Sequence, residues 1–173
     1  MKTYTFDDIV AALNAIAPYD WAKFLRERVD ANAPPLDGLA AAGWKLVYTD
    51  KPSEYQKHAE SLGKMSNFAA SIGLMIASEG SKISDVRWNG PAFKAGISPG
   101  GTLVAVNGRE YKSERLVEAL NDAKTNHAPI ELLVKNGELY KTFRVDYRDG
   151  AKYPHLERIP GTVDRLGAIF APK

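Results

Sequence analysis

Residues 71–76 read Ser71-Ile72-Gly73-Leu74-Met75-Ile76, a glycine set among apolar side chains. Successive side chains of a strand point to opposite faces, so Ile72, Leu74 and Ile76 share one face and Met75 points to the other. A glycine at position 73 allows the backbone to bend immediately before the strand. The stretch therefore predicts a bent loop that leads into a strand with one apolar face.

Short β-prone runs broken by glycine and proline surround this stretch. They are Phe68–Ala77, Lys82–Trp88, Thr102–Val106, Ile130–Lys135 and Leu139–Tyr147. Asn136-Gly137 predicts a two-residue hairpin turn between the last two runs. Two helical patterns lie between the strands: Pro91–Ala95, with proline at its first position, and Ser113–Lys124, with Ser113 as N-cap. This order predicts an α+β fold, a small partly open β-barrel of five to six strands with two helices.

The N-terminal part of the chain has helical patterning instead. Thr5 is placed to cap a helix with an apolar stripe, and Asp20 to cap a second helix that ends before Ala33-Pro34-Pro35. A third short helix is expected over Leu36–Ala42, followed by a strand over Trp44–Tyr48. Such short helices bury little surface by themselves, so their stripes need a partner: the next domain, a second copy, or polypeptide outside this sequence.

Domain boundaries follow from these changes of pattern. Residues 51–64 are polar and charged, as expected of a linker or a solvated helix. We therefore predict a helical segment with a linker at residues 1–63, a β-rich domain at residues 64–149, and an extended tail at residues 150–173.

The charge of the chain is balanced and diffuse. Lysine and arginine total 23 and acidic residues total 21, a net charge of +2 with no long run of one sign, so we expect no nucleic acid partner. The chain has no cysteine, which excludes disulfides and thiolate metal sites but leaves both cytoplasm and periplasm open. The first residues lack the basic and then apolar order of a signal peptide, and no apolar stretch is long enough for a membrane span.

Three motifs between Ser71 and Asp122 resemble those of a PDZ domain, a module that binds peptides. They are Ser71–Ile76 as the carboxylate-binding loop and following strand, Pro91–Gly96 as the short helix, and Ser98–Gly108 as the turn and strand after it. The resemblance implies that backbone N–H groups of a bent loop at Gly73 hold the terminal carboxylate of a peptide. The peptide backbone would then add a strand to the unpaired edge of the strand that follows.

The resemblance also implies which residues contact the peptide. Val117 and Leu120 of the later helix would face the apolar side of the strand. The predicted peptide-binding residues are Ser71, Ile72, Gly73, Leu74, Met75, Ile76, Ser113, Val117 and Leu120. The expected partner is a protein C-terminus or an internal peptide segment.

Two of these positions depart from the family pattern. Ser71 replaces the first loop glycine, which leaves binding of internal peptides open beside capture of a chain end. Ser113 stands where many eukaryotic members have a histidine that selects a serine or threonine of the ligand, and it equally suits a helix N-cap. The apolar members of the set also suit a core packed under a helix, so the same pattern predicts either a groove or a core.

The flanking segments resemble the region after the catalytic core of bacterial glycyl aminopeptidases, thermolysin-like zinc metallopeptidases with a C-terminal PDZ domain. The matching segments are Phe6–Asn14, Tyr19–Trp21, Pro35–Leu39, Trp44–Tyr48, Tyr153–Thr162 and Asp164–Leu166. The resemblance implies that the helical segment is a remnant of a catalytic domain, that this domain is a partner of the chain, and that zinc belongs to it. It also implies a periplasmic or secreted location.

The chain itself shows no zinc peptidase motif. A thermolysin-like site needs two histidines four residues apart with a glutamate beside the first, whereas His58, His127 and His155 are far apart in the sequence. No serine is accompanied by a base that the sequence reveals. We therefore expect a non-catalytic module without a cofactor of its own, which binds peptides for a parent peptidase or regulates it.

Two other interpretations of the same residues stay open. One is a free-standing adaptor that binds partner proteins through the groove and has no link to proteolysis. The other is a structural cap whose groove is closed by the helical segment or by the C-terminal tail. The sequence leaves open the ligand, the specificity of a parent enzyme and the oligomeric state.

Overall fold

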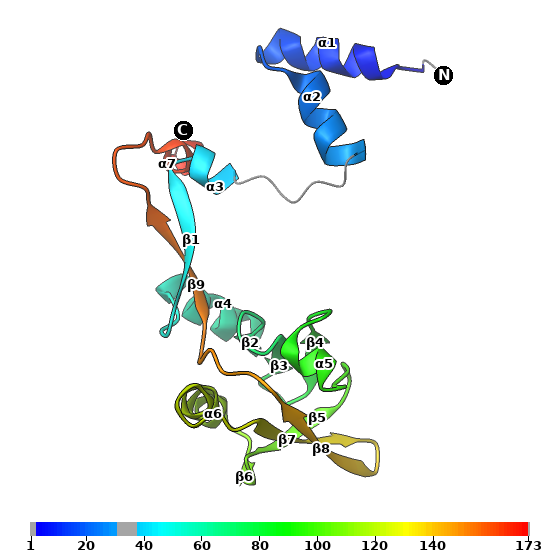
Figure 1. Cartoon of the computed structure of the whole chain (residues 1–173), viewed down its shortest axis with the longest axis vertical. Helices are drawn as coiled ribbons and strands as arrows, with labels where there is room; N and C mark the ends of the chain where they lie inside the picture. Colours follow the sequence, from blue (N-terminus) through cyan, green and yellow to red (C-terminus); the bar gives the residue numbers. More distant parts are fainter. Residues whose placement is uncertain (1–2, 31–37, 173) are drawn as a thin grey trace. The chain divides into compact units, whose positions relative to one another are not determined.

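The computed structural model describes residues 3–30 and 38–172, and these fall into two units (Figure 1). Unit 1 combines residues 1–43 with residues 161–173, and unit 2 spans Trp44–Pro160. The division differs from the predicted boundaries after residues 63 and 149. The reason is that β1 (Trp44–Thr49) and β9 (Tyr153–Arg158) pair with each other inside unit 2.

Short helices make up the described part of unit 1. They are α1 (Phe6–Ile16), α2 (Trp21–Leu25), the π-helix η1 (Arg26–Asp30), α3 (Gly38–Ala41) and α7 (Arg165–Phe170). The Thr5 hydroxyl accepts a hydrogen bond from the Asp8 N–H, and the Asp8 carboxylate accepts one from the Thr5 N–H. This capping box confirms the predicted helix start, and its hydrogen bonds lower the pKa of Asp8. Asp20 caps α2, as predicted.

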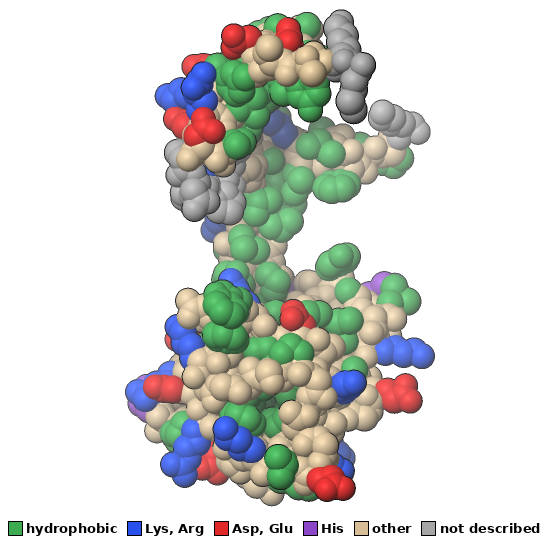
Figure 2. Space-filling model, turned by 90° about the vertical axis from the view of Figure 1, so that its right-hand side faces the viewer, with side chains coloured by type: hydrophobic (Ala, Val, Ile, Leu, Met, Phe, Trp, Pro, Cys, Tyr) green, Lys and Arg blue, Asp and Glu red, His purple; other side chains and the backbone are tan. Residues whose placement is uncertain are grey.

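The helices of unit 1 bury none of their own side chains. Ile16 and Val29 are 83% and 75% exposed, and Figure 2 shows hydrophobic side chains on the surface of α1 and α2 in its upper part. Exposed stripes of this kind agree with the expectation that these helices need a partner surface. The beginning of the third predicted helix, at Leu36, lies outside the described residues.

Unit 2 begins and ends with the two strands of an antiparallel ribbon. Trp44 lies opposite Arg158, and the pairing continues without a break to Thr49 opposite Tyr153. The predicted extended tail at residues 150–173 therefore contains the strand β9, which is extended, and the short helix α7. Helix α4 (Glu54–Gly63) follows β1 and is capped by the Ser53 hydroxyl.

The rest of unit 2 contains two sheets and two helices. One sheet has the order β2-β3-β4, and the other has the order β6-β5-β7-β8. Their strands are β2 (Met65–Phe68), β3 (Leu74–Ala77), β4 (Ile83–Val86), β5 (Thr102–Val106), β6 (Arg109–Glu110), β7 (Ile130–Asn136) and β8 (Leu139–Val145). The helices are α5 (Pro91–Lys94) and α6 (Ser113–Asn126). The α+β class is confirmed, the two sheets contain seven strands where five to six were predicted, and the described residues form no closed barrel.

A single apolar core joins the two sheets to α6. Leu74 of β3, Leu120 of α6 and Leu132 of β7 are all fully buried. The sheets are also connected by a bridge between Lys82 and Thr102. The core therefore lies where the two sheets and the helix meet, and it fixes the position of β3.

Three local details differ from the predictions. The predicted strand Phe68–Ala77 is interrupted by a loop at residues 69–73, which separates β2 from β3. The hairpin turn between β7 and β8 consists of Gly137 and Glu138, because Asn136 already pairs with Leu139. The N-cap of α6 is Lys112 rather than Ser113.

Replacing a fully buried side chain of β3 should destabilise unit 2. Leu74 is 0% exposed, so Leu74→Ala is expected to lower the free energy of unfolding by about 2–5 kcal/mol through lost transfer energy and a cavity. Urea unfolding followed by circular dichroism measures the change. The matched control is Leu62→Ala, because Leu62 is 74% exposed, and its effect should stay within about 0.5 kcal/mol. Similar losses for both variants would contradict this placement of the core.

Candidate peptide-binding groove

The predicted peptide-binding residues come together from one loop, one strand and one helix. Ser71, Ile72 and Gly73 lie in the loop between β2 and β3, Leu74, Met75 and Ile76 lie in β3, and Ser113, Val117 and Leu120 lie in α6.

Gly73 forms the predicted bend before β3. Its φ is +81°, a conformation that side chains with a Cβ rarely adopt, and a Cβ at this position would lie 3.2 Å from the Arg87 Cβ. The Gly73 carbonyl accepts a hydrogen bond from the Arg87 N–H at 2.8 Å. The glycine therefore lets the loop turn closely past the end of β4.

Both edges of β3 are already paired. β4 pairs with one edge, and β2 pairs with the other, with Phe68 opposite Leu74 and Met65 opposite Ala77. The prediction of an unpaired edge is wrong, because the chain itself supplies the strand that a guest peptide was expected to add. An open edge leaves N–H and C=O groups unpaired, and a segment only five residues away can satisfy them at little cost in loop-closure entropy.

The donors of the loop are also occupied from within the chain. The N–H groups of Ser71 and Gly73 donate hydrogen bonds to the Phe68 carbonyl oxygen, at 3.1 and 3.0 Å. These are convergent backbone donors of the kind expected to hold a peptide carboxylate. The Phe68 side chain is 3% exposed and belongs to the core. Phe68 thus takes up both parts of the predicted binding site: its ring belongs to the apolar core, and its carbonyl oxygen accepts the hydrogen bonds of the loop.

β2 also approaches the start of α6. The phenol of Tyr111, two residues before this helix, lies near the side chains of Ser66 and Ser113, and both lower its pKa. Burial raises the pKa of Tyr111 to about 12, which outweighs the effect of the two serines. Ser66 of β2 therefore lies near the segment that leads into α6.

The apolar members of the predicted set pack into the core. Ile72, Leu74, Ile76 and Leu120 are at most 1% exposed, and Val117 is half-buried against the same core. Of the two interpretations of this pattern, the packed core under a helix is the one that the structure shows.

Sequence reasoning did not find Met65–Phe68 as a strand, because Ser66 and Asn67 at its centre are polar. Their environment explains the polarity. The Asn67 side-chain oxygen accepts a hydrogen bond from the Ala69 N–H, and the Glu60 carboxylate accepts bonds from the Asn67 N–H and from Gln56. Glu60 belongs to α4, so the helix before β2 helps to hold the strand in place.

Ser71, at the position where the resemblance implied a loop glycine, has a structural contact of its own. Its hydroxyl accepts a hydrogen bond from the Lys152 N–H at 2.9 Å. The neighbouring Ala151 N–H donates to the Asn121 side chain on α6 at 3.0 Å. Ser71 therefore ties the segment before β9 to the loop, and it is 6% exposed.

One pattern typical of a nucleophile was not recognised in the sequence. Residues Gly96-Ile97-Ser98-Pro99-Gly100 match the spacing Gly-x-Ser-x-Gly. In a nucleophile elbow this motif turns from a strand into a helix, whereas here it leads from α5 to β5. The context therefore does not fit that catalytic motif.

The described residues do not form a metal centre or a membrane span. No three His, Cys, Asp or Glu side chains gather in a way that could hold a metal ion, so the residues present in that part of the chain do not fit the zinc of a metallopeptidase. No described helix has the length and apolar character needed to cross a bilayer.

The fold of nearly the whole chain recurs within a longer protein. No protein-family model and no curated protein matches the sequence. The crystal structure of an aminopeptidase N family protein from Idiomarina loihiensis matches 98% of this chain at 16% identity with a TM-score of 0.57. The match covers 29% of that protein, so this chain spans less than a third of its length.

A second solved structure resembles the chain more weakly. It is the HtrA3 PDZ domain bound to a phage-derived ligand (FGRWV), which matches 76% of this chain and all of that domain at 16% identity. The TM-score is 0.33, which is too low to assign the fold.

Removing the Ser71 hydroxyl should loosen the segment before β9. Ser71→Ala leaves the half-buried Lys152 N–H without its acceptor, so we expect a loss of about 0.5–1.5 kcal/mol in the free energy of unfolding. Hydrogen exchange at Lys152 should become faster. Ser78→Ala is the matched control, because Ser78 is exposed. An unchanged exchange rate at Lys152 in Ser71→Ala would show that the contact does not hold this segment.

Stability should fall at alkaline pH. Burial raises the pKa of Tyr111 and of Tyr147 from 10.0 to about 12. Both groups keep their protons in either state below pH 10, whereas between about pH 10 and 12 the unfolded chain releases protons that the folded chain retains, so stability decreases as pH rises. Urea unfolding across this range measures the slope, and Tyr111→Phe should make it shallower. The same slope in wild type and variant would contradict the burial of this phenol.

Proposed function

We propose that this chain is a non-catalytic PDZ-like module of a longer aminopeptidase-type protein, and that its groove is permanently filled by β2. The observation that carries the proposal is the pairing of β3 on both edges, together with the two loop donors held by Phe68. The recurrence of the fold within a much longer aminopeptidase-family chain supports its place in a larger protein.

In this proposal the module positions or stabilises other parts of the parent protein and does not capture free peptides. Zinc and the peptidase reaction belong to a catalytic domain outside this chain, and that domain is the partner of the module. A periplasmic or secreted location belongs to the same proposal. The exposed helices of unit 1 support it, because apolar stripes of that kind require a covering surface.

The energetic reason for a closed groove is the burial of Phe68. A guest strand would replace the backbone hydrogen bonds of β2, but Phe68 would first have to leave the core. Exposing a phenylalanine costs about 1.5–3 kcal/mol, which weakens the guest by about 10- to 100-fold. A peptide that would otherwise bind at about 1 μM would bind near 10–100 μM or more weakly.

A second candidate function is peptide binding after β2 leaves the groove. One observation favours it: β2 is extended and antiparallel to β3, and its last carbonyl meets the loop donors, as the end of a bound peptide would. In this case the module handles substrates for a parent peptidase, or serves as a free-standing adaptor.

A peptide screen separates these functions. Fluorescence polarisation should be measured with labelled peptides that have a free apolar C-terminus, against the wild-type chain, Phe68→Ala and the control Leu62→Ala. We expect the wild type and Leu62→Ala to bind no better than about 100 μM, and Phe68→Ala to bind at least about tenfold more tightly. Binding near 1 μM by the wild type would contradict a permanently filled groove and favour the second candidate. Equally weak binding by all three proteins would show that peptide binding is not a function of this module.

A further inference from the structure

Three asparagines of the chain are followed by glycine: Asn89, Asn107 and Asn136. In such a pair the backbone nitrogen of the glycine can attack the side-chain carbonyl carbon of the asparagine, because glycine has no Cβ to obstruct the approach. The reaction needs a glycine N–H group that is free of other partners and a carboxamide that can turn towards it. The surroundings of each pair therefore decide how readily it reacts.

The pair Asn89-Gly90 is held in the loop after β4. The Gly90 N–H donates a hydrogen bond to the Arg87 carbonyl oxygen at 3.0 Å, and Gly90 is buried. A Cβ at Gly90 would lie 3.0 Å from the same oxygen. The attacking nitrogen of this pair is therefore both occupied and enclosed.

The pair Asn107-Gly108 forms the turn between β5 and β6, and its carboxamide is bound. The Asn107 side-chain oxygen accepts a hydrogen bond from the Glu131 N–H at 2.9 Å, and the Asn107 N–H donates one to the Glu131 carbonyl oxygen at 2.8 Å. Both bonds join Asn107 to β7. The carboxamide must give up its bond to Glu131 before it can turn towards Gly108.

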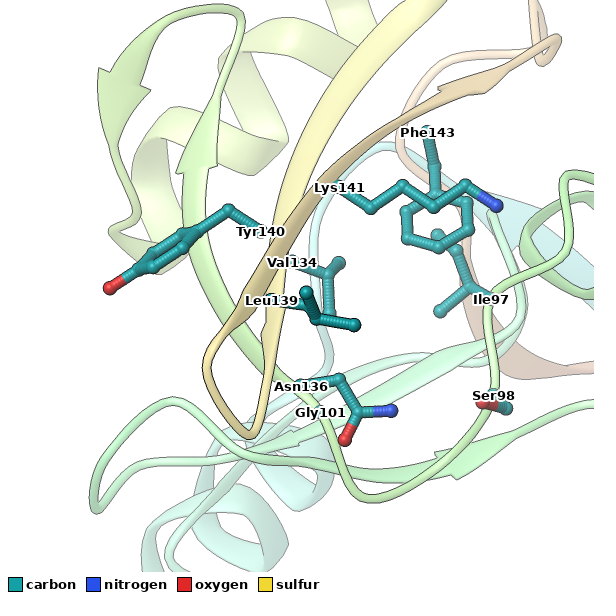
Figure 3. A pocket seen from close by; sticks show the side chains of 9 residues that line it. All are labelled: Ile97, Ser98, Gly101, Val134, Asn136, Leu139, Tyr140, Lys141 and Phe143. Atoms are coloured by element: carbon teal, nitrogen blue, oxygen red, sulfur yellow. The ribbon is translucent and has the colours of Figure 1, made fainter.

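Asn136 has neither restraint. It ends β7 and is exposed, and Gly137 follows it in the turn of the hairpin. Among the described residues, neither the Asn136 carboxamide nor the Gly137 N–H has a hydrogen-bond partner, and a Cβ at Gly137 would meet nothing within 4 Å. Figure 3 shows the Asn136 carboxamide at the end of the hairpin, in the wall of the pocket that Leu139 also lines. Both reacting groups are therefore open to solvent.

The reaction also needs a change of backbone conformation, which the end of the hairpin permits. A succinimide ring cannot form while Asn136 keeps the extended conformation of a strand, so its pair with Leu139 must open. This is the last pair before the turn, and both residues are exposed. Local opening at the end of an exposed hairpin costs little free energy compared with global unfolding. The rest of the β7–β8 pairing can stay in place.

We propose that Asn136 is a modification site, at which spontaneous deamidation with water yields aspartate and isoaspartate faster than at Asn89 or Asn107. Hydroxide removes the proton of the Gly137 nitrogen, and this nitrogen bonds to the Asn136 Cγ. The Cγ–Nδ2 bond then breaks, and ammonia leaves with a proton taken from water. Water opens the resulting succinimide at one of its two carbonyl carbons, which gives either aspartate or isoaspartate.

Either product changes the hairpin. A carboxylate replaces a neutral carboxamide, in sequence between Lys135 and the turn residue Glu138, and in the wall of a pocket that Lys141 also lines. Isoaspartate in addition lengthens the main chain by one carbon before Gly137, so the pair with Leu139 no longer keeps its register. This modification is independent of the groove beside β3 and goes beyond the proposed function.

The test uses the full chain, incubated at mildly alkaline pH. Peptide mass spectrometry after proteolysis measures the conversion at each asparagine separately, so Asn89 and Asn107 are internal controls. A synthetic peptide with the sequence of residues 132–141 shows that the conditions permit the reaction. We expect Asn136 to convert at least about tenfold faster than either control, because only its pair opens locally. Equal rates at the three sites, or no conversion at Asn136 while the peptide converts, would overturn the proposal.

A pair of glycine variants tests the attacking nitrogen. Gly137→Ala places a Cβ beside this nitrogen and should slow the conversion of Asn136 about tenfold. Gly80→Ala is the matched control, because Gly80 has φ +65° against +62° for Gly137, and a Cβ at either position would meet nothing within 4 Å. It should leave the rate at Asn136 unchanged, and circular dichroism checks that both variants fold. An unchanged rate in Gly137→Ala, or equal decreases in the two variants, would contradict the proposal.

Discussion

The carbonyl oxygen of Phe68 accepts hydrogen bonds from the N–H groups of Ser71 and Gly73, and the strand that ends at Phe68 pairs along β3. This interaction determines what the rest of unit 2 can do. It satisfies the backbone donors of the loop, closes one edge of the sheet and buries an aromatic ring in the core. Without this interaction, the loop donors, the edge of β3 and the apolar position of the ring would be available to a ligand.

The neighbouring elements support the same interaction from two sides. Glu60 of α4 accepts a hydrogen bond from the β2 backbone, and Tyr111 lies beside Ser66 at the start of α6. Ser71 connects the loop to the segment that leads into β9. β9, the last strand of unit 2, pairs with β1, its first strand. The contact of Ser71 with the segment before β9 therefore connects the loop to both ends of unit 2.

The sequence predicted the features that depend on near neighbours. The start of α1 follows from Thr5 and Asp8, three residues apart, and the bounds of β5 follow from an apolar run between glycines. The alternation of Ile72, Leu74 and Ile76 indicated the buried face correctly, but not what covers it. The role of Ser71 depends on Lys152, 81 residues later, and local patterns do not show such a contact. The pairing of β2 was missed because its central residues are polar, and their partners are supplied by α4 and by Tyr111.

A cross-link across β2 and β3 tests the filled groove most directly. The chain has no cysteine, so the double variant Asn67→Cys with Met75→Cys, which are directly opposite, can form a single disulfide. Opposite residues of antiparallel strands lie about 4.5–5.5 Å apart between Cα atoms, within the range that a disulfide spans. The control pair, Asn67→Cys with Ala77→Cys, is two positions out of register. Rapid, nearly complete oxidation of the first pair and slow oxidation of the second is the predicted result, and equal rates for the two pairs would contradict the account.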